Sequence, residues 1–143
     1  MDAWTVLDLN PTFSVAVHGD VGFERNAFGS SSWQASALYA RARLVPHLWL
    51  ALRGDVLWEQ VPESATGSAT PIFFPARRVG SGTATLDFRP VDSLSVRLEL
   101  RHDRASSEIY FQHEVIGDGS TDSPFVANAR TQTTLTLGAT AWF

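Results

Sequence analysis

Charged residues of both signs alternate with apolar residues, most clearly between Leu94 and Asp103. One set of alternate positions is leucine and valine, and the other set carries Arg97, Glu99 and Arg101. On an extended strand, residues two apart point to the same side and lie about 7 Å from each other. Guanidinium and carboxylate groups at that spacing can pair as ordered forks and can sort passing polar solutes by charge. The chemistry that this pattern favours is therefore a charged lining rather than a reaction.

The same alternation recurs in the other extended segments. We expect the charged positions to line the lumen of a channel, with arginines on one wall and carboxylates on another, so that a transverse field crosses the passage. The alternative is that these pairs only hold the wall together or plug it. The candidate lining residues are Asp20, Glu24, Arg41, Arg43, Arg53, Asp55, Asp87, Arg97, Glu99, Arg101 and Asp103.

The elements that must position these residues are strands, because apolar residues recur every second position and rarely at helical spacing. We expect a further strand at Glu108–Val115 only if that segment pairs with a neighbour instead of forming a loop. The seven predicted strands cover residues 4–9, 13–24, 33–44, 48–59, 81–88, 94–103 and 132–143.

The predicted connectors alternate in length, a pattern typical of outer-membrane barrels, which have tight turns at one rim and long loops at the other. The fold class expected is all-β: an antiparallel transmembrane β-barrel, a meander of about seven or eight strands, forming a single domain over residues 1–143. The short connectors are residues 10–12, 45–47 and 90–93, and the long ones are residues 26–31, 62–79 and 105–128.

Whether the chain completes a barrel is left open by the sequence. Bacterial barrels normally have an even number of strands, at least eight, so seven falls one short. The N-terminal residues contain neither a basic region nor an apolar stretch of the kind that opens a secretory signal. Both observations fit an incomplete barrel or the C-terminal part of a larger one.

Composition excludes several other classes of protein. The 143 residues include no cysteine, and the net charge is −4 with all eleven basic residues arginine, which argues against thiol chemistry and against nucleic-acid binding. No apolar run is long enough for a transmembrane helix. The four histidines lack metal-ligand spacing. We therefore expect no metal, no cofactor, no catalytic residue and no enzymatic activity.

The C-terminal residues resemble the β-signal that ends outer-membrane proteins. The pattern has a polar residue, a glycine, a spaced apolar position and a terminal aromatic, here Thr136, Gly138, Ala141 and Phe143. The resemblance implies that the barrel-assembly machinery recognises the last strand. Ala141 departs from the pattern, since a larger apolar residue is usual there.

Residues 33–41 and 96–104 are similar to the last hairpins of the OmpL-like β-barrel porins, and Thr131-Gln132-Thr133-Thr134 matches their Gln/Thr-rich closing strand. The resemblance implies an outer-membrane channel of Gram-negative bacteria for passive diffusion of small polar solutes. Its expected partners are outer-membrane lipid, the solutes, and either further copies of the chain or the remainder of a larger barrel. Two alternatives stay open: a soluble, lipocalin-like ligand-binding barrel, and a small outer-membrane enzyme or adhesin.

Overall fold

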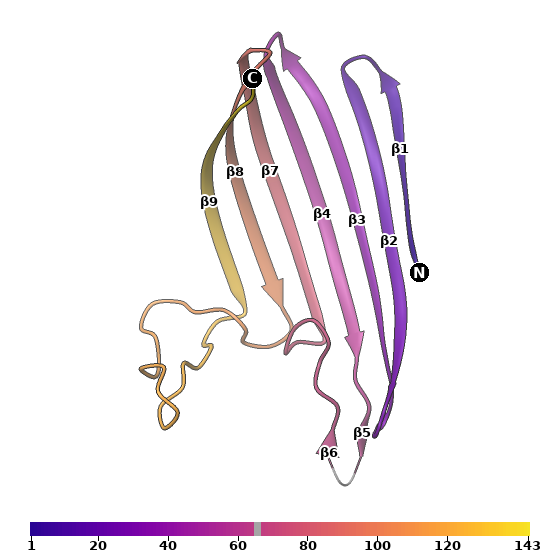
Figure 1. Cartoon of the computed structure of the whole chain (residues 1–143), viewed down its shortest axis with the longest axis vertical. Helices are drawn as coiled ribbons and strands as arrows, with labels where there is room; N and C mark the ends of the chain where they lie inside the picture. Colours follow the sequence, from indigo (N-terminus) through magenta and orange to yellow (C-terminus); the bar gives the residue numbers. More distant parts are fainter. Residues whose placement is uncertain (65–66) are drawn as a thin grey trace.

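The computed structural model describes residues 1–64 and 67–143, and the described residues contain no helix (Figure 1). Seven strands form one antiparallel sheet in the order β1-β2-β3-β4-β7-β8-β9, and two short strands, β5 and β6, form a separate hairpin. The strands are β1 Asp2–Asn10, β2 Phe13–Asn26, β3 Gly29–Val45, β4 Leu48–Gln60, β5 Glu63–Ser64, β6 Gly67–Ser68, β7 Arg78–Val91, β8 Leu94–Ala105 and β9 Thr131–Ala141.

The sheet is a meander in which each main strand pairs with the next one along the chain. The register places apolar residues opposite apolar residues on neighbouring strands. Leu100, for example, lies opposite Ala84 on β7 and opposite Leu135 on β9. A slip of one residue would exchange the two faces, so the alternation itself fixes this register. The predicted all-β fold and its seven strands are confirmed.

The connector predicted over residues 26–31 is wrong, because β2 and β3 meet in a tight hairpin. Asn26 pairs with Gly29, and the Asn26 side-chain oxygen accepts the Phe28 backbone N–H at 3.0 Å. Gly29 has φ of 140°, a region that glycine enters without strain. The Asn26 amide also donates to the Ser31 hydroxyl at 2.9 Å, which fixes the start of β3. The β4–β7 and β8–β9 connectors, which are long, lie at this same end of the sheet (Figure 1).

Residues 108–115 form no strand of the sheet. They belong to the long β8–β9 connector, where two isolated bridges, Tyr110 with Ala129 and Ile116 with Val126, fold the loop back on itself. The Asn128 side chain holds this fold by donating to the backbone oxygens of Gln112 and Glu114, both at 2.9 Å. The sequence did not decide whether residues 108–115 form a strand or a loop, and the structure shows a bridged loop.

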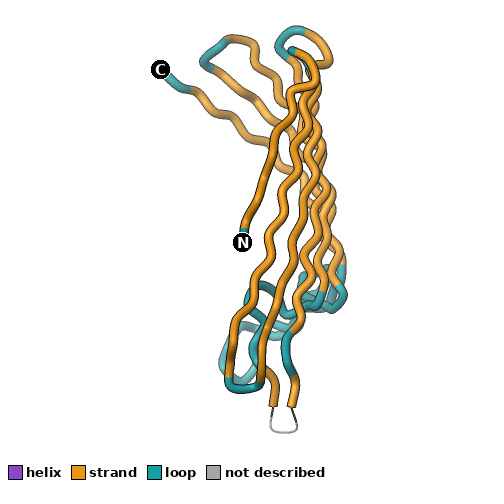
Figure 2. The backbone as a smooth tube through the Cα atoms, turned by 90° about the vertical axis from the view of Figure 1, so that its right-hand side faces the viewer, coloured by secondary structure: helices purple, strands orange, loops and turns teal. Residues whose placement is uncertain are grey.

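The sheet is a single curved layer with two free edges, β1 and β9 (Figure 2). No second layer covers either face, so the buried apolar residues among the described positions are few and mostly small: Ala37, Ala76, Val79, Ala105 and Ala129. The chain alone does not close a barrel. What organises the fold is the chemical difference between the two faces of one sheet.

Candidate functional site

One face of the sheet, here called the polar face, carries every carboxylate that lies on the seven main strands. The pairing register assigns each residue to a face: Asp55 lies opposite Ser81, Ser81 opposite Asp103, and Asp103 opposite Gln132. All eleven candidate lining residues lie on this polar face, namely Asp20, Glu24, Arg41, Arg43, Arg53, Asp55, Asp87, Arg97, Glu99, Arg101 and Asp103. Their role in lining a lumen stays a prediction.

The opposite face, here called the apolar face, exposes large hydrophobic side chains. Leu38 is 60% exposed and Leu137 is 75% exposed, whereas the polar-face carboxylate Asp103 is only 4% exposed. This distribution is the reverse of that in a soluble sheet, where leucine is covered and carboxylates meet water. Strand β1 is the exception, because Trp4 and Val6 lie on the polar face.

Ion pairs fix most of the guanidinium groups of the polar face. Arg53 contacts Asp55 at 2.8 Å, and Arg101 contacts Asp103 at 2.8 Å. Each pair joins residues two apart on one strand, the arrangement that the sequence pattern indicates. Charge-assisted contacts of this kind hold a long side chain in one orientation.

A second cluster centres on Asp87, which is buried. Its carboxylate accepts hydrogen bonds from Arg89 at 2.8 Å and from the Ser95 hydroxyl at 2.6 Å, and Arg97 lies 3.7 Å away. Arg89 and Ser95 were not predicted as site residues. Both lie at the ends of their strands beside a turn, where the alternation gives little signal.

Aromatic rings also orient three arginines of the polar face, one of which, Arg53, is already paired with Asp55. Arg41 lies over the Trp49 ring at 4.1 Å, Arg43 lies over the same ring at 5.6 Å, and Arg53 lies over Tyr39 at 5.4 Å. Cation–π contacts orient a guanidinium without neutralising it. Among the described residues no carboxylate pairs with Arg41 or Arg43, so this part of the polar face keeps uncompensated positive charge.

The sequence predicted arginines on one wall and carboxylates on another, but the structure does not separate the charges in this way. Strand β8 alone carries Arg97, Glu99, Arg101 and Asp103 on one face. In two ion pairs the arginine lies one side-chain step nearer the short turns than its aspartate, Arg53 before Asp55 on β4 and Arg101 before Asp103 on β8.

The β4–β7 connector folds over the loop end of the polar face and is tied there by Glu59. This buried carboxylate, 4% exposed, accepts the backbone N–H groups of Ile72 and Phe73. The Phe73 ring meets Trp33 edge-on at 5.5 Å, and the Trp33 indole N–H donates to Asp20 at 2.6 Å. The connector is thus attached to the sheet at two neighbouring points.

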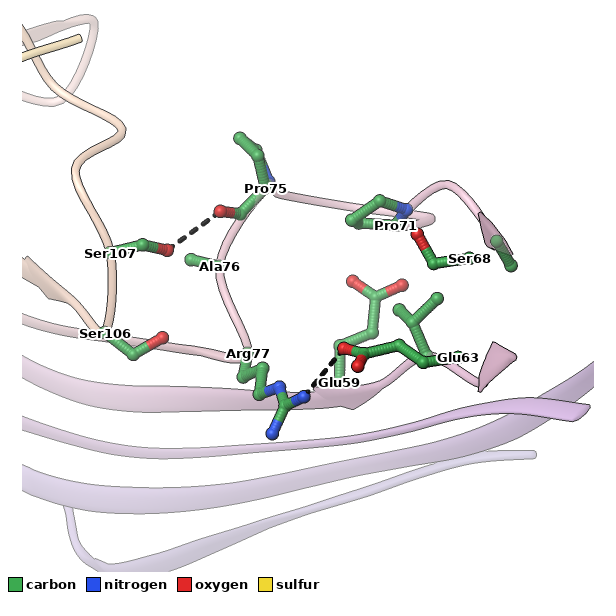
Figure 3. A pocket seen from close by; sticks show the side chains of 11 residues that line it. Glu59, Glu63, Ser68, Pro71, Pro75, Ala76, Arg77, Ser106 and Ser107 are labelled. Atoms are coloured by element: carbon green, nitrogen blue, oxygen red, sulfur yellow. Dashed lines mark hydrogen bonds and ion pairs between the residues drawn. The ribbon is translucent and has the colours of Figure 1, made fainter. Parts of the chain in front are cut away.

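The β8–β9 connector packs against the first one. Ser107 donates to the Pro75 carbonyl at 2.8 Å, closing a pocket of about 470 Å³ into which the Glu59 carboxylate projects (Figure 3). Ile109 and Tyr110 pack on the small cluster formed by Ala76, Val79 and Ala105. Burial, and then the nearby Asp103 carboxylate, raise the pKa of the Tyr110 phenol.

The residues that bring the loops onto the sheet were not among the predicted site residues. Glu59 shares the parity of Asp55, and Trp33 shares that of Arg41, so the alternation could have placed both on the polar face. Nothing in the local pattern connects Glu59 with Ile72, because that contact depends on how the connector folds back. The terminal motif divides between the faces, with Thr136 and Gly138 on the polar face and Ala141 on the apolar face at the edge strand β9.

Other kinds of site find no support in the described part of the chain. It holds no group of three or more acidic or histidine side chains arranged to bind a metal ion. His18 contacts Asp2 at 2.5 Å, and His102 contacts the Thr133 hydroxyl at 2.9 Å on the apolar face. No helix among the described residues could span a membrane.

The family model described as "Putative beta-barrel porin-2, OmpL-like" matches the chain over residues 1–143. The chain belongs to this family. Neither the search of curated proteins nor the search of solved structures gave a match. Membership in a porin family agrees with the resemblance drawn from residues 33–41 and 96–104. It also supports a porin-like role for the two-faced sheet rather than a soluble lipocalin-like one.

Proposed function

We propose that the chain forms part of the wall of an outer-membrane channel, through which small polar solutes diffuse passively. In this arrangement the polar face meets the aqueous lumen and the apolar face meets lipid. The observation that carries the proposal is that every carboxylate of the seven main strands lies on the polar face, opposite a face of exposed leucine, valine and phenylalanine.

The dimensions of the apolar face support the proposal. On β7 the apolar face runs from Gly80 to Phe88, with the arginine Arg78 at its loop end. The eight residue steps from Gly80 to Phe88 span about 26 Å along the strand, or about 20 Å at the tilt usual in barrels. That height is close to the apolar band of about 25 Å in an outer-membrane barrel.

The folded β4–β7 connector supports a restricted passage. Phe73 and the Glu59 carboxylate lie over the loop end of the polar face, above the paired Arg53 and Asp55. In a closed barrel a loop in this position would narrow the lumen at its mouth. Solute size would then be limited by the connector, and solute charge by the fixed ion pairs below it.

The C-terminal strand is proposed as the contact with the barrel-assembly machinery. Strand β9 is a free edge, and an assembly factor can pair with the unpaired backbone groups of such an edge. Removal of Phe143 is expected to lower the yield of heat-modifiable, folded protein in outer membranes, while refolding in detergent stays unchanged. Unchanged yield in membranes would contradict this role.

Passage of solute is tested by liposome swelling with the full chain reconstituted in phospholipid vesicles. We expect uptake of small sugars and amino acids to fall steeply with solute size. Protein that stays monodisperse without detergent and does not enter vesicles would overturn the proposal and favour a soluble, ligand-binding barrel. Vesicle insertion with hydrolysis of an ester lipid, and no swelling, would favour the enzyme alternative.

A further inference from the structure

Two arginines, Arg78 and Arg104, lie at the loop end of the apolar face, beyond its hydrophobic middle, and Arg130 borders the same hollow. Arg78 begins β7, Arg104 lies next to the end of β8, and Arg130 immediately precedes β9. All three are exposed and border one hollow of about 720 Å³. His102 and Thr131 border the same hollow. A phosphate group could contact more than one guanidinium here, because each offers a planar fork of donors.

No carboxylate neutralises this cluster. The main-strand carboxylates lie on the polar face, and none of the three arginines forms an ion pair within the described part of the chain. Asp55 borders the hollow, but its carboxylate is engaged on the polar face with Arg53 at 2.8 Å and with the Ser81 hydroxyl at 2.7 Å. The side chain of Arg78 stacks over Trp58 at 5.4 Å, which holds it beside the hollow.

An apolar groove of about 500 Å³ continues from this hollow along the same face. The two share Gly82 and His102, and the groove is bordered farther along by Leu38, Leu52 and Leu100. Its floor is low because Gly54 pairs directly with Gly82, and a Cβ atom built on either glycine would meet nothing within 4 Å. The apolar border and the volume of the groove suit a hydrocarbon chain.

We propose that the hollow and groove together bind one phosphorylated, acylated lipid of the outer leaflet. Arg78 and Arg104 contact its phosphate, and an acyl chain lies over Gly54 and Gly82. The inference rests on the proposed function, because it requires the apolar face to meet lipid. It also fits the orientation expected of barrels, in which long loops are extracellular. Charged side chains cost least at the membrane interface, which is where these arginines lie.

The test measures binding of fluorescent diphosphorylated lipid A to the full chain in detergent. The double variant R78Q/R104Q is expected to bind about 30-fold more weakly, from the loss of two interfacial arginines. The matched control R25Q/R77Q removes the same charge at the same end of the molecule. Arg25 lies on β2, away from the hollow, and Arg77 pairs with Glu63 at 3.0 Å. The control is expected to bind as the unsubstituted chain does.

Two further arms separate the headgroup from the acyl chain. Gly82→Leu fills the groove without changing charge, and we expect it to weaken lipid A binding while heat-modifiable folding is retained. Dephosphorylated lipid A is expected to bind poorly, and millimolar inorganic phosphate is expected not to displace the lipid.

Several outcomes would overturn the proposal: equal loss in both double variants, no effect of Gly82→Leu, equal binding of the dephosphorylated lipid, or displacement by free phosphate. Liposome swelling reports the channel independently of this binding measurement. A channel without lipid A binding and lipid A binding without a channel are therefore distinct results.

Discussion

At the scale of single residues, the burial of Asp103 makes its partner important. Asp103 is 4% exposed and contacts Arg101 at 2.8 Å, so removing the guanidinium leaves a buried carboxylate without its cation. Asp87 differs, because Arg89 and Ser95 still bind it when the more distant Arg97 is removed. The two clusters therefore offer a matched comparison.

We expect Arg101→Met to lower the free energy of unfolding by about 2–3 kcal/mol, the cost of leaving a charged hydrogen-bonding group unpaired. Arg97→Met, the control, is expected to lower it by less than about 1 kcal/mol, as for an exposed ion pair. Urea titration of the refolded protein, followed by tryptophan fluorescence, measures both. Equal losses would show that the pairing with Asp103 is not what stabilises β8.

At the scale of elements, the β4–β7 connector depends on one side chain of the sheet. Glu59 accepts two backbone N–H groups of the connector, whereas Glu63 lies in the connector hairpin with an exposed ion pair to Arg77. The two glutamates are four residues apart but differ in burial. Only the first joins the loop to the polar face.

Glu59→Ala is expected to release the connector, because it removes charge-assisted hydrogen bonds together worth about 3 kcal/mol. Larger solutes should then pass in liposome swelling, and protease should cleave near Phe73 faster. Glu63→Ala is the control and is expected to change neither. An unchanged solute cut-off in Glu59→Ala would contradict a narrowing role for the connector.

The strands themselves could be predicted from the sequence, and the loop contacts could not. Alternation over Leu94–Asp103 gives both the strand and its two faces, since the side-chain period of a strand is two. The tight hairpin at Asn26–Gly29 was missed because it depends on an Asn side chain bonding the Phe28 backbone. The contact of Phe73 with Trp33 joins positions forty residues apart, and no local pattern encodes it.

At the scale of the whole molecule, the two faces must meet different solvents. Leu86 on the apolar face and Thr85 on the polar face are neighbours near the middle of β7. We expect Leu86→Arg to cost about 2–4 kcal/mol of folding free energy in bilayers, the value for a charge facing hydrocarbon. Thr85→Arg should cost much less, because it faces water. Folding titrations in lipid vesicles measure the difference, and a reversed order would place lipid on the polar face.

The odd number of strands constrains how the sheet can close. In a meander of seven strands, β1 and β9 run in the same direction, so antiparallel pairing cannot join them directly. A second copy with the same orientation in the membrane meets the same obstacle. An open edge cannot face lipid. Closure therefore needs either further strands at the edges or a parallel pair, within one chain or between copies, and liposome swelling by the chain alone requires the parallel pair.

Cysteine pairs test this directly, because the chain has no cysteine of its own. We expect a Thr5→Cys chain combined in turn with Thr133→Cys, Leu135→Cys or Leu137→Cys to form no intramolecular disulfide on mild oxidation. Thr5→Cys with Val17→Cys should form one, since these residues pair across β1 and β2. Efficient cross-linking of β1 to β9 would show a seven-stranded barrel closed by a parallel pair.

The sequence by itself determined the strands, their parity and the set of charged residues that share a face. It could do so because the two-residue period of a strand is local and chemical. Only the tertiary structure decided which loops cover the polar face, how Glu59 and Trp33 hold them, and that Arg78, Arg104 and Arg130 border one hollow. Those contacts join residues distant in the sequence, and they depend on register and on how the connectors fold back.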